Sequence, residues 1–471
     1  MLARRFARSV RYFGPGLYGW PRPGCAQLFS NLSDRSLRIV QNREEQTFEK
    51  RGEKQAFELT NVASRISLFE KALHHLLPKN FHSSVPKSYL EYSKVYAVGT
   101  IASSAAMVLS TQSLLYAIGL GAGAIPLSAA INWVLKDGLG QMGGVLFASL
   151  VNNRFDADPK RWRIVAAISL DFAMYLEAMT PLMPVLFLPL AAIANVGKNI
   201  SWLAASATRA GIHLSFAKDH NLADITAKAG SQTVVASTIG TGVGIVLSSF
   251  VGTDPLAILP CVFLLSGGHL FSMYKSLQHV TLDTLNSQRG DIFTRDYLAK
   301  CGGGESDSAG SEYMTPAMVA QEELVVGEYG KYLRDGHEEQ SRIVIGMKFE
   351  EFLRTGSFEG DDVVEHVVSQ LKCRGFHLDL AADRKKVGLI FADDATSKDM
   401  LQGYVTAHIL YEYHALSTFA GMAPRVIVES ALEKGEETIE PYLLALAECG
   451  WNVDHVFFDE KNFAKVKVLH A

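Results

Sequence analysis

The sequence predicts a mainly α-helical fold, in which a multi-span helical membrane domain is followed by a soluble, acidic α+β domain. From Val95 to Leu135 the chain has 41 residues without Asp, Glu, Lys or Arg, and a helix needs roughly 20 apolar residues to cross a bilayer. The charge also changes along the chain: residues 1–279 hold 26 Lys+Arg and 16 Asp+Glu, whereas residues 280–471 hold 19 and 33. Only the second part has the charge density of a soluble domain.

Residues 1–33 are basic, with arginines at positions 4, 5, 8, 11 and 22 and no acid before Asp34. A helix through Leu2, Phe6, Val10 and Phe13 would place an apolar stripe among these arginines, which is typical of an organelle transit peptide. The alternative is a basic tail without regular structure.

A mixed, charged region covers residues 34–78. Within it, Asn61–Leu77 carries apolar residues at helical spacing and predicts an amphipathic lead-in helix that ends before Pro78. Such a helix lies on a membrane surface or packs against the domain that follows.

Residues 79–290 predict the helical membrane domain, with four to six passes. The candidate spans are Val95–Gly119, Ile164–Asn195, Ser231–Val251 and Leu256–Tyr274. The second of these is expected to break or turn near Pro181, Pro184 and Pro189. Shorter apolar segments, one after Pro126 and one from Gly138 to Val151, leave the number open. The alternative is a soluble helical bundle, since the mean hydropathy is only +0.10.

Glycines four residues apart recur in this domain, at Gly119/Gly123, Gly140/Gly144 and Gly240/Gly244. This spacing lets two helix backbones approach closely inside a membrane, where lipid supplies no hydrophobic drive for association. The glycines therefore favour the membrane interpretation over the soluble bundle.

A Gly/Ser-rich linker at residues 301–311 marks the next domain boundary. Residues 312–471 then alternate between short apolar runs and helical patterns, which predicts an α+β domain. Its expected strands are Arg342–Gly346, a hairpin within His377–Phe391 and Asp454–Phe458, and its expected helices are Asp362–Cys373, Ser397–Leu416 and Glu440–Cys449.

Ionisable residues within the apolar region are the first candidates for function, because a charge at the centre of a membrane helix costs about 2.5–3.5 kcal/mol and needs a partner or water. Asp171 and Glu177 lie six residues apart and project toward similar sides of one helix. Lys198 and Arg209 can neutralise them from the next segment. Structural ion pairs and residues reaching for lipid headgroups are the alternatives. The candidates are Lys136, Asp137, Asp171, Glu177, Lys198 and Arg209.

A second group of candidates opens the apolar run that follows. Asp224 and Lys228 lie one helical turn apart, with Gln232 one turn further. An exposed pair of this kind contributes only about 0.3–0.5 kcal/mol to stability. This small contribution does not by itself explain why the pair is present. We expect these residues to contact a polar headgroup or a small anion.

The sequence contains no convincing motif of a common enzyme family. Gly138-Leu-Gly140-Gln-Met-Gly143 matches the dinucleotide-binding pattern GxGxxG, but the twelve residues before Asp156 leave no room for the helix and second strand of that unit. The five cysteines form no CxxC pair, and the histidines show no metal-ligand spacing. We therefore expect no enzyme activity, no cofactor and no metal, and keep a GxGxxG-dependent enzyme as the third hypothesis.

Five sequence blocks in order resemble the root UVB sensitive family. They are WVLKDGLGQMGG (133–144), FDADPKRWR (155–163), EAMTPLMP (177–184), ATRAGI (207–212) and NLADITAKAGSQ (221–232). The resemblance covers Lys79 to Leu285 and, more loosely, the C-terminal domain. It implies a eukaryotic membrane protein of a family named for lost ultraviolet-B tolerance in plant roots, with plant members in plastids. It supplies no catalytic residues.

Two functional hypotheses follow. In the first, a non-enzymatic membrane protein binds or transports a small polar molecule through a charged intramembrane core. In the second, the helices anchor an interaction scaffold whose C-terminal domain recruits a protein partner or a family paralogue. Under both hypotheses we expect the protein to lie in a lipid bilayer and to bind no nucleic acid. The membrane is expected to be that of an organelle, and the choice between mitochondrion and plastid stays open.

Overall fold

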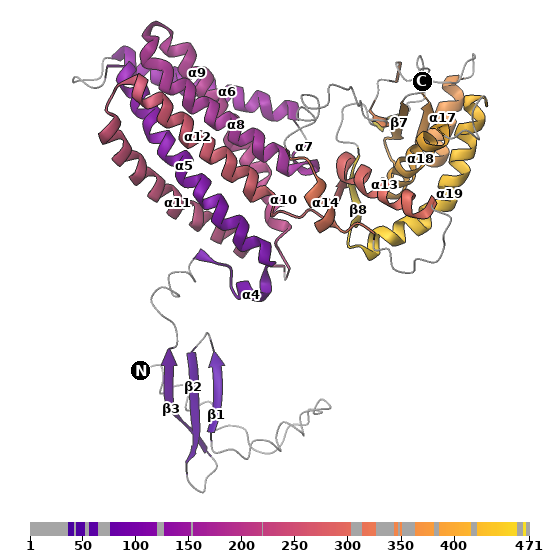
Figure 1. The fold of residues 1–471 in the computed structure, drawn as a ribbon, viewed down its shortest axis with the longest axis horizontal. Coiled ribbons are helices and arrows are strands. Elements are labelled where there is room, and N and C mark those ends of the chain that lie inside the picture. The colour runs from indigo at the N-terminus through magenta and orange to yellow at the C-terminus, as the bar shows by residue number, and fades with distance from the viewer. Residues whose placement is uncertain are drawn as a thin grey trace. The chain divides into compact units, whose positions relative to one another are not determined.

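The computed structural model places a helical bundle before a mixed α/β domain (Figure 1). The residues it describes are 36–41, 44–51, 56–64, 76–119, 127–151, 154–218, 220–302, 313–325, 343–346, 349–350, 363–380, 386–415, 422–458 and 465–467. The chain divides into two compact units, Met1–His75 and Leu76–Ala471. The expected transit peptide at 1–33 lies outside the described residues.

In the first unit, strands β1 (Ser36–Gln41), β2 (Glu44–Arg51) and β3 (Ala56–Ser64) form an antiparallel sheet in that order. Strand β3 covers Asn61–Ser64, where the sequence predicted the start of a helix, so the prediction differs from the structure there. Backbone pairing of β3 with β2 satisfies the amide groups that a helix would have bonded internally. The rest of the expected helix, up to residue 75, lies outside the described residues.

The second unit begins with a short helix, α4 (Phe81–Ser84), and a bundle of long helices. These are α5 (Lys87–Ala117), α6 (Leu127–Val151), α8 (Pro159–Met179), α9 (Phe187–Ala207), α11 (Leu222–Val251) and α12 (Pro255–Leu277). Helix α5 packs against α8, α11 and α12, while α9 packs between α8 and α6. Two short helices, α7 (Arg154–Ala157) and α10 (Arg209–Leu214), connect longer ones.

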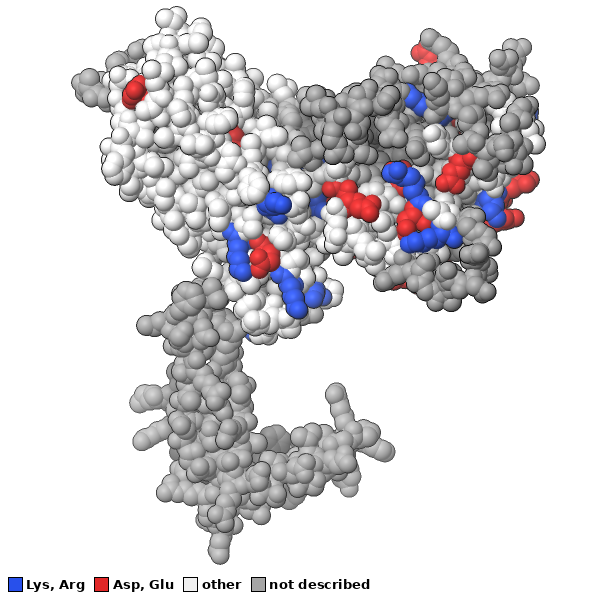
Figure 2. Space-filling view, in the orientation of Figure 1, with Lys and Arg blue, Asp and Glu red and all other residues white. Residues whose placement is uncertain are grey.

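Five stretches of the described chain are long and apolar enough to cross a membrane: Lys87–Ala117, Pro159–Leu182, Pro184–Leu214, Leu222–Val251 and Pro255–Leu277. Large apolar side chains such as Val145, Phe250 and Leu264 are exposed on the bundle. Figure 2 shows few charged side chains over most of the visible face of the bundle. The charged side chains lie near α4 and α10 and over the C-terminal domain. This mainly helical architecture confirms the predicted fold class.

The prolines at 181 and 184 divide one predicted span into two helices. After α8, the chain turns through two 3₁₀ segments, η2 (Thr180–Leu182) and η3 (Pro184–Leu186), each with proline in its first turn. Helix α9 then packs back against α8. The break occurs where the sequence placed it, because proline cannot donate the backbone hydrogen bond that would continue α8.

Two glycine pairs bring helices together, as their spacing predicted. A Cβ at Gly240 would meet the Ile101 carbonyl oxygen and lie 2.8 Å from Ser104 Cβ on α5, and one at Gly244 would lie 2.8 Å from Val108 Cβ. Gly140 and Gly144 lie against α9 in the same way. Gly119 differs: it has φ +81° directly after α5, where it ends the helix.

The C-terminal domain is built on a sheet of β5 (Ile343–Ile345), β7 (Val387–Ala392) and β6 (Phe376–Leu380), with β9 (Lys465–Val466) also paired to β7. Strands β6 and β7 form the predicted antiparallel hairpin. The domain's longer helices are α17 (Val363–Arg374), α18 (Ser397–Ala415) and α19 (Pro424–Glu448). This mixed α/β region is the predicted second fold class.

The core of this domain begins before the Gly/Ser-rich linker. Strand β4 (Thr284–Asn286) pairs in parallel with β8 (Asn452–Phe457), and α13 (Ser287–Gly302) follows it. Phe293 and Tyr297 of α13 are buried in the same apolar cluster as Phe376 and Leu389 of the sheet. The apolar face of α13 is thus covered by residues that follow the linker.

Candidate functional site

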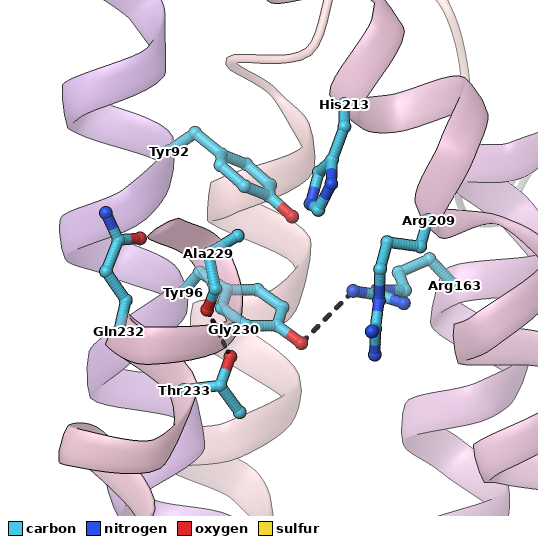
Figure 3. Close-up of a pocket in the computed structure, with 9 residues that line it drawn as sticks. All are labelled: Tyr92, Tyr96, Arg163, Arg209, His213, Ala229, Gly230, Gln232 and Thr233. Carbon is cyan, nitrogen blue, oxygen red and sulfur yellow. Dashed lines mark hydrogen bonds between the residues drawn. The ribbon is translucent and has the colours of Figure 1, made fainter. Parts of the chain in front are cut away.

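A pocket opens in the bundle where α5, α8, α10 and α11 meet (Figure 3). Its volume is about 180 Å³. The lining residues are Tyr92 and Tyr96 from α5, Arg163 from α8, Arg209 and His213 from α10, and Ala229, Gly230, Gln232 and Thr233 from α11. Four helices therefore build one site, and α5 lies far from α10 and α11 in the sequence.

Arg163 is the most constrained cation of the pocket. It lies one turn into α8 and is only 3% exposed. Its guanidinium donates to the Tyr96 hydroxyl oxygen over 3.1 Å and to the Ala205 carbonyl oxygen. Its Nε has no hydrogen-bond partner among the described residues. Burial of a permanent charge with neutral partners is expensive, so this guanidinium is suited to an anionic ligand.

Arg209 is exposed and approaches the pocket from α10, and Figure 3 shows its side chain beside that of Arg163. Helix α10 begins directly after Thr208, whose hydroxyl donates to the Ala204 carbonyl oxygen at the end of α9 over 2.8 Å. Neither arginine forms an ion pair with a described carboxylate, and the lining residues include no Asp or Glu. Among the described residues, no carboxylate therefore compensates the positive charge of the pocket.

Aromatic and polar groups complete the walls. The Tyr92 and Tyr96 rings are stacked with their centroids 5.6 Å apart. The His213 Nδ1 lies 3.0 Å from the Thr226 hydroxyl, and the Thr233 hydroxyl donates to the Ala229 carbonyl oxygen over 2.9 Å. Guanidinium groups bind phosphate or carboxylate in a bidentate manner, and tyrosines offer a ring face and a hydroxyl. The arrangement can bind a small anion that has a flat apolar part.

Two of the nine sequence candidates line this pocket, Arg209 and Gln232. The Gln232 amide also donates to the Leu76 carbonyl oxygen over 2.6 Å, which holds the start of the second unit against α11. Asp224, two turns earlier on α11, accepts from the Lys79 backbone amide over 2.7 Å. Lys228 lies between Asp224 and Gln232 on α11 and is not among the lining residues.

The other candidates form separate pairs in the bundle. Glu177 on α8 accepts from Lys198 on α9 over 2.6 Å and from the Ser110 hydroxyl over 3.0 Å. Asp171 pairs with His269 on α12 at 2.9 Å. Lys198 thus neutralises Glu177 as the sequence suggested, whereas Arg209 does not neutralise Asp171.

The last pair lies within α6. Lys136 bonds the neighbouring Asp137 over 2.5 Å and also lies 4.5 Å from the centroid of the Trp133 ring. The Asn195 amide of α9 donates to the Asp137 side chain over 3.2 Å. Gly138 to Gly143, the dinucleotide-like pattern, lies inside this same helix, so the pattern serves helix packing and not a strand–turn–helix unit.

Sequence reasoning missed Arg163, Tyr92, Tyr96 and His213 as site residues. Arg163 was not among the candidates, although it falls in one of the five blocks that resemble the family. Its burial depends on α8 starting at Pro159, with Asp158 accepting from the Arg161 amide as a helix cap. An Asp-Pro helix start immediately before it was the available signal. Among the described residues no group of three His, Cys, Asp or Glu is placed to hold a metal.

The model of the "Vitamin B6 photo-protection and homoeostasis domain" family matches residues 63–301. Root UVB sensitive 2, chloroplastic, of Arabidopsis thaliana is 29% identical over 388 residues, which cover 82% of this chain and 83% of that protein. Root UVB sensitive 6 of the same plant is 36% identical over 225 residues, 48% of this chain and 44% of that protein.

A relative outside plants, RUS family member 1 of Dictyostelium discoideum, is 33% identical over 217 residues, 45% of this chain and 41% of that protein. No solved structure matches. The family match includes every helix that lines the pocket. The five sequence blocks, the family match over half of the chain and the relatives agree, and the chain belongs to the root UVB sensitive family.

Proposed function

We propose that this chain is a non-enzymatic membrane protein that binds a small anion in the pocket between α5, α8, α10 and α11 and moves it across the bilayer. The observation that carries the proposal is the buried Arg163 beside Arg209, without a described carboxylate in the pocket wall. An anion entering the pocket would supply the missing countercharge. Transport then concerns this pocket, since Lys136 and Asp137 neutralise each other, as do Glu177 and Lys198.

The family description suggests the chemical class of the anion. It names vitamin B6, whose phosphorylated forms join a flat pyridine ring to a phosphate monoester. The two arginines complement the phosphate, and the rings of Tyr92 and Tyr96 complement the pyridine. The volume of about 180 Å³ lies below the roughly 300 Å³ where pockets for drug-sized ligands begin, which favours a ligand of one ring.

The lining residues support binding more than catalysis. The Thr233 hydroxyl is bonded to the helix backbone, and the hydroxyl in contact with His213 belongs to Thr226, which is not among the lining residues. The membrane setting is supported by the five apolar helices and by the exposed apolar side chains. The chloroplastic relative supports an organelle membrane, which alkaline carbonate extraction of isolated organelles tests directly.

Binding of pyridoxine 5′-phosphate and of pyridoxine to the full chain in lipid nanodiscs tests the proposal. This phosphate ester has no aldehyde and forms no Schiff base with lysines. It should bind at least tenfold more tightly than pyridoxine. Arg209→Gln should weaken its binding about 10-fold to 150-fold, because a hydrogen bond to a charged group contributes about 1.5–3 kcal/mol.

The matched control is Arg425→Gln, which removes the same charge from an exposed pair with Glu429 on α19. This variant should bind like the wild type. Equal affinity for pyridoxine and its phosphate, or wild-type affinity in Arg209→Gln, would refute the anion pocket.

A scaffold role remains the second candidate, supported by two exposed large apolar residues, Met422 just before α19 and Val426 in its first turn. A partner protein covering them would depend on the C-terminal domain. Truncation at Ser311 is a poor test, because it uncovers Phe293 and Tyr297 of α13. Substituting Met422 and Val426 by Ser is cleaner: loss of function with pyridoxine 5′-phosphate binding intact would favour the scaffold.

A further inference from the structure

Helix α8 connects the pocket to two ionisable pairs deeper in the bundle. Arg163 lines the pocket, Asp171 follows eight residues later and Glu177 six residues after that. At 1.5 Å per residue these steps are about 12 Å and 9 Å along the helix. All three side chains are at most 6% exposed. Helix α8 therefore places ionisable side chains both at the pocket and in the interior of the bundle.

The two pairs differ in how fully they are bonded. Glu177 is held by Lys198 and by the Ser110 hydroxyl, which makes a permanent ion pair. Asp171 is bonded to His269 through one oxygen, and its Oδ1 is buried with no hydrogen-bond partner among the described residues. Ser266, one turn before His269 on α12, also has a buried hydroxyl without such a partner. The hydrogen-bonding capacity of the Asp171–His269 pair is thus only partly used by the described residues.

Histidine is the side chain whose charge changes near neutral pH, and buried Asp/His groups in membrane helices mark proton relays. With histidine neutral the Asp171–His269 pair has a net charge of −1, and with histidine protonated it is neutral. A single proton therefore changes the charge of the pair by one unit. The Glu177–Lys198 pair has no histidine and is not expected to change in this way.

The pair is also in contact with the pocket through α5. Gly99 packs against α12, and a Cβ there would lie 3.1 Å from Ser272 Cβ and 3.6 Å from His269 Cδ2. Tyr96, one turn before Gly99, accepts the hydrogen bond from Arg163. Both α5 and α8 thus lead from the pocket arginine to the Asp171–His269 pair, and Figure 1 shows α5, α8 and α12 side by side.

We infer that Asp171 and His269 form a proton-binding site coupled to the pocket, so that the chain takes up a proton together with its anion. The inference rests on the proposed anion pocket. A negative ligand near Arg163 disfavours the −1 state of the pair, and the proton in turn favours the ligand, because coupling between two sites is reciprocal. Two unit charges about 12 Å apart at an effective dielectric constant of about 20 give a coupling of about tenfold.

Other ionisable groups near the pair do not replace it. From α5 come Tyr92 and Tyr96, whose hydroxyl groups are of a type that ionises only in alkaline solution. From α8 and α9 come Arg163, which stays charged, and the Glu177–Lys198 ion pair. Helix α12 adds the exposed Lys275, six residues beyond His269 and bonded to Gln278.

The test is the affinity of the full chain in nanodiscs for pyridoxine 5′-phosphate from pH 5 to 9, compared with two variants. Dividing each variant's affinity by that of the wild type removes the titration of the probe itself. Asp171→Asn makes the pair one unit more positive than the wild type in each state, 0 with His269 neutral and +1 with it protonated, and should bind about tenfold more tightly at both ends of the range. His269→Gln keeps the −1 charge and should bind about tenfold more weakly at low pH, with equal affinity at high pH.

The control is Glu440→Gln, which removes a carboxylate outside the α5–α8–α12 core, from an exposed pair with Lys398 on the C-terminal domain, and should leave the pH profile unchanged. Opposite effects of the two core variants are not expected from a loss of packing alone. If either well-folded core variant keeps the wild-type affinity at every pH, the coupling is wrong although the pocket stands. If the wild type binds no pyridoxine 5′-phosphate at any pH, the proposed function itself fails.

Discussion

Single residues of the bundle show how a charged group is accommodated at a helix start. Asp158 caps α8 and bonds the Arg161 side chain at 2.9 Å, yet its side chain is only 10% exposed. Burial raises the pKa of Asp158 from its usual value to about 6, against the lowering effects of Arg161 and Arg289. The neutral carboxyl is therefore favoured more in the folded chain than in the unfolded one.

This shift predicts a pH dependence of stability. A carboxyl whose pKa is higher in the folded state opposes folding as it ionises, so its contribution should fall as pH rises from about 4 to about 6. Asp158→Asn keeps the cap, since Asn caps helices as well as Asp, and removes the ionisation. The difference in thermal unfolding temperature between variant and wild type should therefore grow in favour of the variant between pH 4.5 and 7. A constant difference would contradict the buried cap.

The candidate residues show what sequence could and could not predict at this scale. Lys198 and Arg209 were predicted together as partners of Asp171 and Glu177, because charges in long apolar runs need countercharges, and the structure pairs Lys198 with Glu177. The partner of Asp171 was not found, because His269 carries no obligatory charge and lies 98 residues away in the chain. Arg163 was missed since a basic residue near a loop is ordinarily solvated, and only the three-dimensional packing of α5 and α10 encloses it.

At the scale of elements, helix packing depends on where side chains are missing. Gly240 and Gly242 lie two residues apart on α11, and so on different sides of the helix. A Cβ at Gly240 would collide with α5, whereas a Cβ at Gly242 meets nothing within 4 Å. Substituting Gly240 and Gly242 by alanine in turn therefore separates two effects: the close packing of helix backbones, which concerns Gly240, and the low helix propensity of glycine, which concerns both positions.

Gly240→Ala should lower the free energy of unfolding by about 1–3 kcal/mol, because overpacking forces α5 and α11 apart. Gly242→Ala should be neutral or stabilise by up to about 1 kcal/mol, since alanine favours helix more than glycine does. Thermal unfolding of the two variants in detergent measures the difference. Equal destabilisation by both would show that α11 does not pack against α5 through Gly240.

Most elements of the bundle could be predicted because apolar length and proline breaks are local properties. Helix α6 was the exception: Lys136 and Asp137 split it into two segments that looked too short. In the structure these two charges neutralise each other, and the helix continues for 25 residues. Strand β4 was not predicted, because three residues carry no periodicity and its partner β8 is far along the chain.

For the whole molecule, a buried ion network joins the helical bundle to the C-terminal domain. Glu323, which follows α14 (Pro316–Glu322), accepts from Lys160 on α8 over 2.6 Å and from Arg289 on α13 over 2.8 Å. Arg289 and Asn286 also donate to the Ala157 carbonyl oxygen. Burial alone would raise the pKa of Glu323. The positive charges of Arg289 and Lys160 have the larger effect and hold the pKa of Glu323 below its usual value.

Glu323→Gln should loosen this junction strongly, because it leaves two buried cations without a countercharge, at a cost of about 3–5 kcal/mol. The expected result is earlier protease cleavage between the bundle and the C-terminal domain and a lower unfolding temperature. The matched control is Glu440→Gln, which breaks an exposed 2.6 Å pair with Lys398 and should change stability by less than about 1 kcal/mol. Similar effects in both variants would contradict the buried junction.

The most direct test of the central claim is a cryo-electron microscopy map of the full chain in nanodiscs with pyridoxine 5′-phosphate. The account predicts density for the phosphate between the guanidinium groups of Arg163 and Arg209, with the pyridine ring against Tyr92 and Tyr96, and no such density with pyridoxine alone. An empty pocket under saturating ligand, or ligand bound elsewhere in the chain, would contradict it.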